Sequence, residues 1–188
     1  MTVSLQNKKG GFTLVETLVA ILIFSSSIVA LLTATSGGLS EVTLLRNKLT
    51  ANYLAQEGIE QVRNVRDQSV AVLGTGGWQS FITNTSTCQN STGCVFSAFP
   101  SISPNPPTIF SCGTPPSDPC ELVVDSLSGL YAPSVPGTIP NPVSSPFRRQ
   151  IVITPSSATE EAKITVTVSW NQGVSSPQVI LEEYLYNW

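Results

Sequence analysis

An uninterrupted apolar stretch near the N-terminus restricts the folds that this chain can adopt. From Phe12 to Thr35 there are 24 residues, and Glu16 carries the only charge among them. As an α-helix this stretch would be about 36 Å long, which is enough to span the apolar core of a bilayer. Lys8 and Lys9 precede it without any acidic residue, so the positive-inside rule places the N-terminus in the cytoplasm. The sequence therefore predicts one membrane-spanning helix followed by an extracytoplasmic remainder.

Hydropathy alone leaves two questions about this stretch open: whether it is removed as a signal peptide, and why it contains Glu16. A cleaved secretory signal peptide has the same basic start and apolar core, and Thr33 to Gly38 (TATSGG) would loosely supply its small-residue cleavage site. Glu16 raises the second question. A charged side chain at the bilayer centre is costly, so a lone carboxylate inside a membrane-length segment is a candidate functional residue.

The segment KKGGFTLVETLVAILIF, which begins at Lys8, resembles the N-terminal signature of type IV prepilins and pseudopilins. The likeness lies in a short basic leader that ends in glycine, then phenylalanine, a Thr-Leu-Val triplet and a glutamate. It implies that a prepilin peptidase cuts between Gly11 and Phe12 on the cytoplasmic face and that the new amine of Phe12 is N-methylated. Residues 1–11 are then the leader peptide, and residues 12–36 are retained as a transmembrane and assembly helix.

The resemblance also implies a role for Glu16. In such filaments the N-terminal helices leave the bilayer and bundle, so the Glu16 carboxylate would pair with the Phe12 ammonium group of a neighbouring subunit. An unpaired buried charge is strongly unfavourable, so a subunit docked in the correct register satisfies both groups. The alternative is that Glu16 lies near the membrane interface, extends to water and has no partner.

A second helical pattern follows the apolar stretch. Residues 39–68 show apolar side chains at helical spacing among polar ones, which predicts an amphipathic helix whose apolar face is core. The positions on that face are Leu45, Leu49, Leu54, Ile59, Val62 and Val65. Its segment ANYLAQEGIEQVRNVRD, from Ala51, resembles the second half of the long helix in pilin-like proteins. Gly37 and Gly38 are expected to mark a bend before it.

The middle of the chain is rich in proline and contains all four cysteines. Twelve of the fourteen prolines lie between Pro100 and Pro146, so residues 72–146 are expected to form extended segments and turns, with a possible short strand at 121–125. The cysteines form no CxxC motif, which makes zinc binding or thioredoxin-like chemistry a poor fit. Three disulfide connectivities are possible and four reduced thiols are the alternative; we favour the sequence-local pairing in an oxidising compartment. The favoured pairs are Cys88 with Cys94 and Cys112 with Cys120.

The C-terminal third has strand patterns. Residues Ala162 to Trp170 alternate apolar and polar side chains, as a half-buried strand does. FRRQIVITP before them and PQVILEEYLYNW after them are also strand-like, which predicts an antiparallel meander. The predicted fold class is α+β and pilin-like, with a long N-terminal helix packed on a C-terminal antiparallel sheet. A long irregular Pro/Ser/Thr-rich insertion completes a head of residues 37–188, in which Trp170 and Trp188 are core or strand-edge aromatics.

Composition weakens the case for several function classes. The chain has no histidine, which removes Ser-His-Asp and Cys-His triads and the commonest ligand of catalytic zinc. A net charge of −3 with 11% charged residues offers no attraction for nucleic acid, which is not an expected partner. Adjacent glutamates in a strand point to opposite faces, so no acid-base pair is expected from them. These glutamates are Glu160, Glu161, Glu182 and Glu183. No catalytic, cofactor-binding or metal-binding residue is predicted.

The resemblance implies a non-enzymatic structural subunit of a type IV pilus or a related pseudopilus, and the irregular insertion favours a minor subunit. The expected partners are other pilin or pseudopilin subunits, prepilin peptidase, the inner or cytoplasmic membrane and the pilus assembly platform. The protein is expected to be a single-pass membrane protein with an extracytoplasmic head and then part of a cell-surface filament. The alternative is a membrane-tethered binding or adhesion protein that never polymerises.

Overall fold

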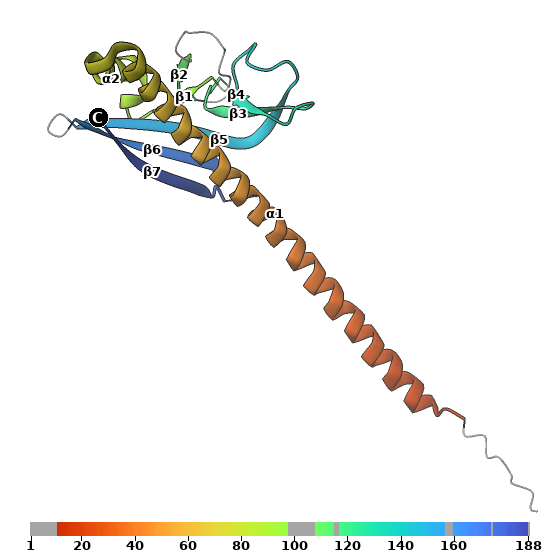
Figure 1. Ribbon diagram of the computed structural model, residues 1–188. Helices are drawn as coiled ribbons and strands as arrows, with labels where there is room; N and C mark the ends of the chain where they lie inside the picture. The colour runs from red at the N-terminus through yellow and green to blue at the C-terminus, as the bar shows by residue number, and fades with distance from the viewer. Residues whose placement is uncertain (1–10, 98–107, 115–116, 157–159, 174, 188) are drawn as a thin grey trace, which may run out of the picture. The chain divides into compact units, whose positions relative to one another are not determined.

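A computed structural model describes residues 11–97, 108–114, 117–156, 160–173 and 175–187, apart from the side chains of residues 36–40 (Figure 1). Its internal contacts divide the chain into two compact units, Met1–Leu45 and Arg46–Trp188. The first unit contains the apolar half of the long helix. The second unit, which we call the head, contains the sheet and the hydrophobic core.

The helix α1 runs from Leu14 to Leu73 and contains 60 residues. Its segment Leu14–Thr35 has a mean hydropathy of 2.3, is long enough to cross a membrane, and has no buried residue in the structure. The helical assignment continues through Gly37 and Gly38. The helix is therefore not interrupted at these glycines, although each glycine disfavours a helix by about 1 kcal/mol relative to alanine. The bend expected there stays a prediction.

Within the described residues, seven strands form one sheet in which every pairing is antiparallel. β5 lies at its centre: it pairs with β6 along one edge and with β1 and β3 along the other. The predicted three-strand meander is confirmed as β5, β6 and β7. The strands are β1 (Cys94–Phe96), β2 (Ile109–Ser111), β3 (Glu121–Asp125), β4 (Tyr131–Pro133), β5 (Pro142–Ser156), β6 (Glu161–Trp170) and β7 (Gln178–Tyr186).

The middle of the chain is more regular than its composition suggests. Besides the short strand at 121–125, which is β3, it holds β1, β2, β4 and the helix α2 (Gly77–Asn84), flanked by the 3-10 turns η1 (Gly74–Gly76) and η2 (Ser86–Gln89). These elements are too short to leave a periodic pattern in the sequence. Tertiary burial stabilises them instead: α2 inserts Phe81 and Trp78 into the main core.

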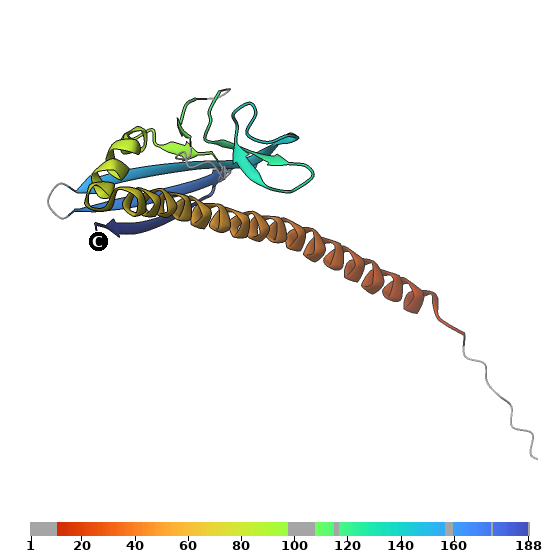
Figure 2. The same ribbon diagram turned by 45° about the horizontal axis from the view of Figure 1, so that its top comes forward.

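The core lies between one face of the sheet and the C-terminal part of α1, which Figure 1 and Figure 2 show lying across β5, β6 and β7. Residues of β6 alternate between buried and partly exposed along its whole length, so one face of the strand packs on the helix. Each large side chain buried there contributes roughly 1.5–3 kcal/mol. The buried helix positions are Ala51, Leu54, Ala55, Ile59, Val62 and Val65.

Two of the six predicted core positions on α1 are not core. Leu45 and Leu49 each remain 59% exposed, and the buried stripe begins only at Ala51. Helical periodicity reveals that an apolar face exists, but it does not reveal how far the protein surface that covers it extends. Trp170, in contrast, is buried in the core as expected, and Trp188 lies outside the described residues.

The two disulfides pair Cys88 with Cys94 and Cys112 with Cys120. The first bond ties η2 to β1, and the second closes a loop whose two cysteines are both buried. Inside this loop the buried Asp118 accepts hydrogen bonds from the backbone N–H groups of Gly113 and Cys120. Each disulfide therefore closes a short local loop within the proline-rich part of the head.

Asp118 also joins the loop to the sheet. Its Oδ2 accepts a 2.6 Å hydrogen bond from Nε of Arg148 on β5. Burial alone would raise the pKa of the Asp118 carboxyl group, but the N–H donors of Gly113 and Cys120 and the Arg148 guanidinium outweigh it and lower that pKa. The resulting stabilisation is present above the ordinary carboxyl pKa and is lost as the pH falls through the lowered value.

We expect Asp118→Asn to lower the free energy of unfolding at pH 7 by about 1–3 kcal/mol, because hydrogen bonds to a charged group are replaced by weaker ones. The same variant should lose less stability than the parent between neutral pH and about pH 3, since it has no carboxyl group to protonate there. Urea unfolding of the detergent-solubilised protein, followed by tryptophan fluorescence, measures both. Glu60→Gln, at an exposed ion pair with Arg63, is the control for loss of a carboxylate, with a change below about 0.5 kcal/mol. If the parent and Asp118→Asn lost the same free energy of unfolding over this pH range, protonation of Asp118 would not be what destabilises the head.

Candidate functional site

The start of α1 has a defined cap. Residues Gly11, Phe12 and Thr13 are non-helical and exposed, and the Oγ1 atom of Thr13 accepts a 3.3 Å hydrogen bond from the N–H of Glu16. Thr13 therefore occupies the N-cap position, and the sequence TLVE has the Thr-x-x-Glu form of a capping box. That signal was present in the sequence and would have located the helix start at Leu14. The Gly11–Phe12 peptide bond consequently lies outside the helix.

Glu16 lies in the first turn of α1, where a negative charge interacts favourably with the helix macrodipole. Its side chain is exposed, and the structure gives the carboxylate no hydrogen-bonding or ionic partner among the described residues. Phe12, four positions earlier, is 80% exposed. In the single chain both groups are thus accessible to another molecule.

Beyond Glu16 the apolar half of α1 exposes hydrocarbon on every side. Polar side chains in it bond back to the helix: the hydroxyl groups of five residues donate to carbonyl oxygens three or four positions earlier. These residues are Thr17, Ser26, Ser27, Thr33 and Thr35. Such back-bonding satisfies a hydroxyl group in an environment without water. This surface is therefore suited to lipid or to the apolar helices of other proteins, and Glu16 is its one charge.

Ion pairs and hydrogen bonds attach α1 to β7 in the head. Arg63 pairs with Glu183 on β7 and with Glu60 on its own helix, and the Glu183 carboxylate raises the pKa of Arg63. One turn later, Nη1 of Arg66 donates a 2.9 Å hydrogen bond to the backbone oxygen of Tyr186. These contacts fix where the helix lies along the strand.

Three of the four glutamates in the two adjacent pairs contact different parts of the head. Glu183 contacts Arg63 beneath α1, whereas Glu182 pairs with Lys163 on the opposite face of the sheet. The Lys163 contact lowers the pKa of Glu182. Glu160 lies in the turn before β6 and accepts a hydrogen bond from Asn187. Each of these three carboxylates thus has a structural partner, and Glu182 and Glu183 point to opposite faces as the strand pattern predicts.

Arg149 on β5 is an unusual residue that no sequence pattern singled out. Its side chain is completely buried under α1, where Nη1 lies 3.2 Å from both the Leu54 carbonyl oxygen and Oε1 of Glu57. Burial lowers the pKa of Arg149, and the Glu57 carboxylate opposes that effect. Gly58 makes the close approach possible, because a Cβ atom there would lie 3.0 Å from Val166 Cγ1 and 3.4 Å from Arg149 Cδ. The strand alternation that buries Ile151 and Ile153 also places Arg149 on the core face.

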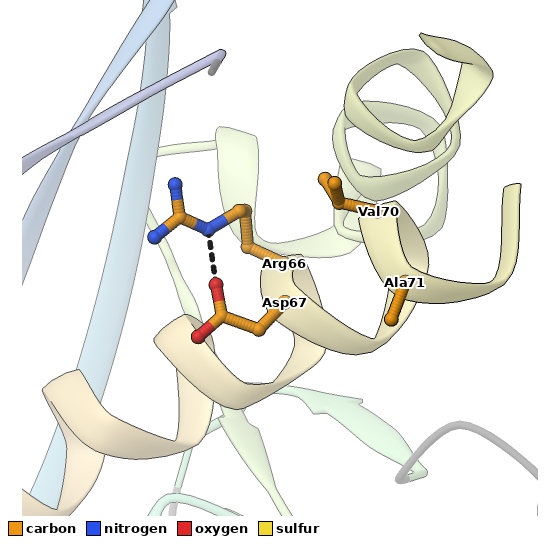
Figure 3. A pocket seen from close by; sticks show the side chains of 4 residues that line it. All are labelled: Arg66, Asp67, Val70 and Ala71. Carbon is orange, nitrogen blue, oxygen red and sulfur yellow. Dashed lines mark ion pairs between the residues drawn. The ribbon is translucent and has the colours of Figure 1, made fainter. Parts of the chain in front are cut away.

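Two further places in the head gather polar groups that a ligand could contact. The side chains of Cys112, Asp118 and Cys120 come within 4.8 Å of one another, but both sulfur atoms belong to a disulfide and are not available as thiolate ligands. The second place is a shallow pocket of about 210 Å³ on α1, lined by Arg66, Asp67, Val70 and Ala71 (Figure 3). An ion pair joins Arg66 to Asp67 at 2.6 Å. Neither place brings together an acid, a base and a nucleophile.

Comparison with known proteins gives a match in the N-terminal segment. The model of the prokaryotic N-terminal methylation motif matches residues 6–32, which include Gly11, Phe12 and Glu16. No curated protein and no solved structure matches the chain. The chain therefore carries the prepilin-type signature, and its α+β architecture is pilin-like. The signature indicates a structural rather than a catalytic protein.

Proposed function

We propose that this protein is a filament subunit of a type IV pilus or a related pseudopilus. The observation that carries the proposal is the match of residues 6–32 to the methylation motif, together with the 22-residue apolar helix that follows its predicted cleavage point. A secretory signal peptide would be removed with its apolar core. A prepilin retains its apolar core and assembles through it. The pilin-like head of this chain also supports the prepilin interpretation.

In this proposal prepilin peptidase hydrolyses the Gly11–Phe12 peptide bond at the cytoplasmic face, and the free amine of Phe12 is then methylated. The exposed, non-helical backbone at residues 11–13 supports this step, since a protease binds an extended chain more readily than a helical one. Thr13 caps the helix immediately after the bond. The cap leaves Phe12 outside the helix, where its amine is accessible to the modifying enzyme.

Assembly would then use Glu16 and the Phe12 amine of adjacent subunits. Inside a bundle of apolar helices an unpaired ammonium or carboxylate group is strongly unfavourable. The accessibility of both groups in the single chain supports a pairing between subunits, which places each new helix at one axial position. The other partners in this scheme are prepilin peptidase, the cytoplasmic or inner membrane and the pilus assembly platform.

The head favours a minor subunit over a major one. Between α1 and β5 its sequence has a long insertion rich in proline, serine and threonine, and two disulfides and Asp118 connect described parts of this insertion. Such a surface suits a subunit that makes specialised contacts at the cell surface. In this proposal the protein resides in the cytoplasmic membrane before assembly and in an extracellular filament afterwards.

The mature N-terminus and the location of the protein test the proposal together. Mass spectrometry of the purified full chain should find N-methyl-phenylalanine at position 12, and filaments sheared from cells should contain the protein. Counting its copies against those of the other subunits separates a minor component from a major one. A Met1 terminus or a terminus near Gly38, with the protein absent from every sheared fraction, would instead identify a membrane-tethered or secreted binding protein that does not polymerise.

A further inference from the structure

The core face of the sheet carries one buried positive charge among apolar side chains. Arg149, on β5, is completely buried, which no other charged residue in the described part of the chain is. A helix that covers this face must therefore supply a partner for a cation as well as apolar surface. The apolar residues around Arg149 on β5 and β6 are Ile151, Ile153, Ile164, Val166 and Val168, all of them fully buried.

The head segment of α1 supplies this partner within two turns. Nη1 of Arg149 lies 3.2 Å from the Leu54 carbonyl oxygen and 3.2 Å from Oε1 of Glu57. The Gln61 amide donates a 2.9 Å hydrogen bond to the same carboxylate oxygen, which helps to orient it. Gly58 follows Glu57 and, having no side chain, permits the close approach of helix and sheet. The partner of Arg149 is thus a glutamate with a glycine directly after it.

The apolar half of α1 lacks this combination. The segment Leu14–Thr35 contains no glycine, and its one carboxylate, on Glu16, is followed by threonine. The segment is rich in leucine, isoleucine and valine, whereas the buried stripe of the head segment includes the small residues Ala51 and Ala55. Hydrophobic stabilisation grows with the apolar area that is buried. Apolar area alone would therefore favour the apolar half, rather than the head segment, as a cover for the sheet.

We propose that Arg149 is a specificity-determining residue, which admits residues 51–65 of α1 to the sheet and excludes the apolar half of α1 from another chain. The cation is paired under the head segment, but under the apolar half it would be buried without a counter-charge, which is strongly unfavourable. The apolar half thereby stays available to lipid or to other apolar helices. This role goes beyond the filament function and does not depend on it, because any chain that holds both helix segments faces the same competition.

Cysteine cross-linking of the full chain in detergent tests the exclusion. None of the native cysteines is free. Val166→Cys places a thiol on the core face of the sheet beneath Gly58, and Leu22→Cys places one on the exposed apolar half. The yield of mixed dimer under mild oxidation should rise at least about tenfold when the Val166→Cys chain also carries Arg149→Met. Glu41→Cys, at an exposed polar position of α1, replaces Leu22→Cys in the matched control and should give no mixed dimer.

Arg149→Lys separates specificity from stability. Lysine keeps the cation but loses the planar guanidinium group with its several donors. This variant should therefore unfold at a lower urea concentration than Arg149→Met and still give no more mixed dimer than the parent. A purely structural role predicts the reverse order, with the most dimer in the least stable variant. Lys163→Met removes a cation from the opposite face of the sheet and should leave the dimer yield at the parent level.

Two results would overturn the proposal. One is an equal yield of mixed dimer in the parent and in Arg149→Met. The other is a higher yield in Arg149→Lys than in Arg149→Met. Neither measurement involves Phe12, so a chain without N-methyl-phenylalanine that is absent from filaments would reject the filament function and leave the role of Arg149 standing.

Discussion

Glu16→Ala is expected to produce a protein that is cleaved after Gly11 and methylated at Phe12 but enters filaments at least about 100-fold less often than the parent. We expect cleavage to depend on the non-helical backbone at residues 11–13, which this substitution leaves unchanged. Assembly would leave the Phe12 ammonium group of a neighbour buried without its carboxylate partner. Removing one member of a buried ion pair costs about 3–5 kcal/mol, and each 1.4 kcal/mol corresponds to a factor of ten.

The measurement is the ratio of the protein in sheared filaments to the protein in membranes, with mass spectrometry of the N-terminus in both fractions. Glu41→Ala removes another exposed carboxylate from the same helix and should leave the ratio unchanged. Normal incorporation of Glu16→Ala would show that Glu16 does not set the register. Loss of cleavage would assign it to peptidase recognition instead.

Arg149→Met and Arg149→Ala are expected to have very different effects on stability. Methionine fills most of the buried volume under α1 and removes a desolvated charge, two of whose donors, Nε and Nη2, have no partner in the described part of the chain. Replacing buried ionic groups with well-packed apolar ones is often neutral or stabilising. Alanine leaves a cavity, which costs about 2–5 kcal/mol in comparable core sites. The free energy of unfolding of Arg149→Met should therefore exceed that of Arg149→Ala by at least about 2 kcal/mol.

Urea unfolding of the full chain in detergent measures this difference. Lys163→Met, at a partly exposed ion pair on the other face of the sheet, is the control and should change stability by less than about 1 kcal/mol. Arg148→Met should instead destabilise the head, because it deprives the buried Asp118 carboxylate of its cation. Equal stabilities for the methionine and alanine variants of Arg149 would show that helix packing over this residue is not tight.

Elements with a long repeating pattern were predicted from the sequence more readily than short elements. The 22-residue apolar helix and the ten-residue strand β6 have enough turns or alternations to be recognised alone. α2, β1, β2 and β4 are too short for that, and contacts with the core determine them. Leu45 and Leu49 were predicted to be core residues but are exposed. Their helical spacing was correct, but burial depends on which surface covers them.

The sequence by itself determined the processing signature, the apolar helix and the alternating C-terminal strands. Each is encoded by residues close together in the chain, so local physical rules are enough to recognise it. Only the tertiary structure decided which part of α1 is core and that Arg149 is buried against Leu54 and Glu57. These properties depend on contacts between residues far apart in sequence, and no local pattern carries that information.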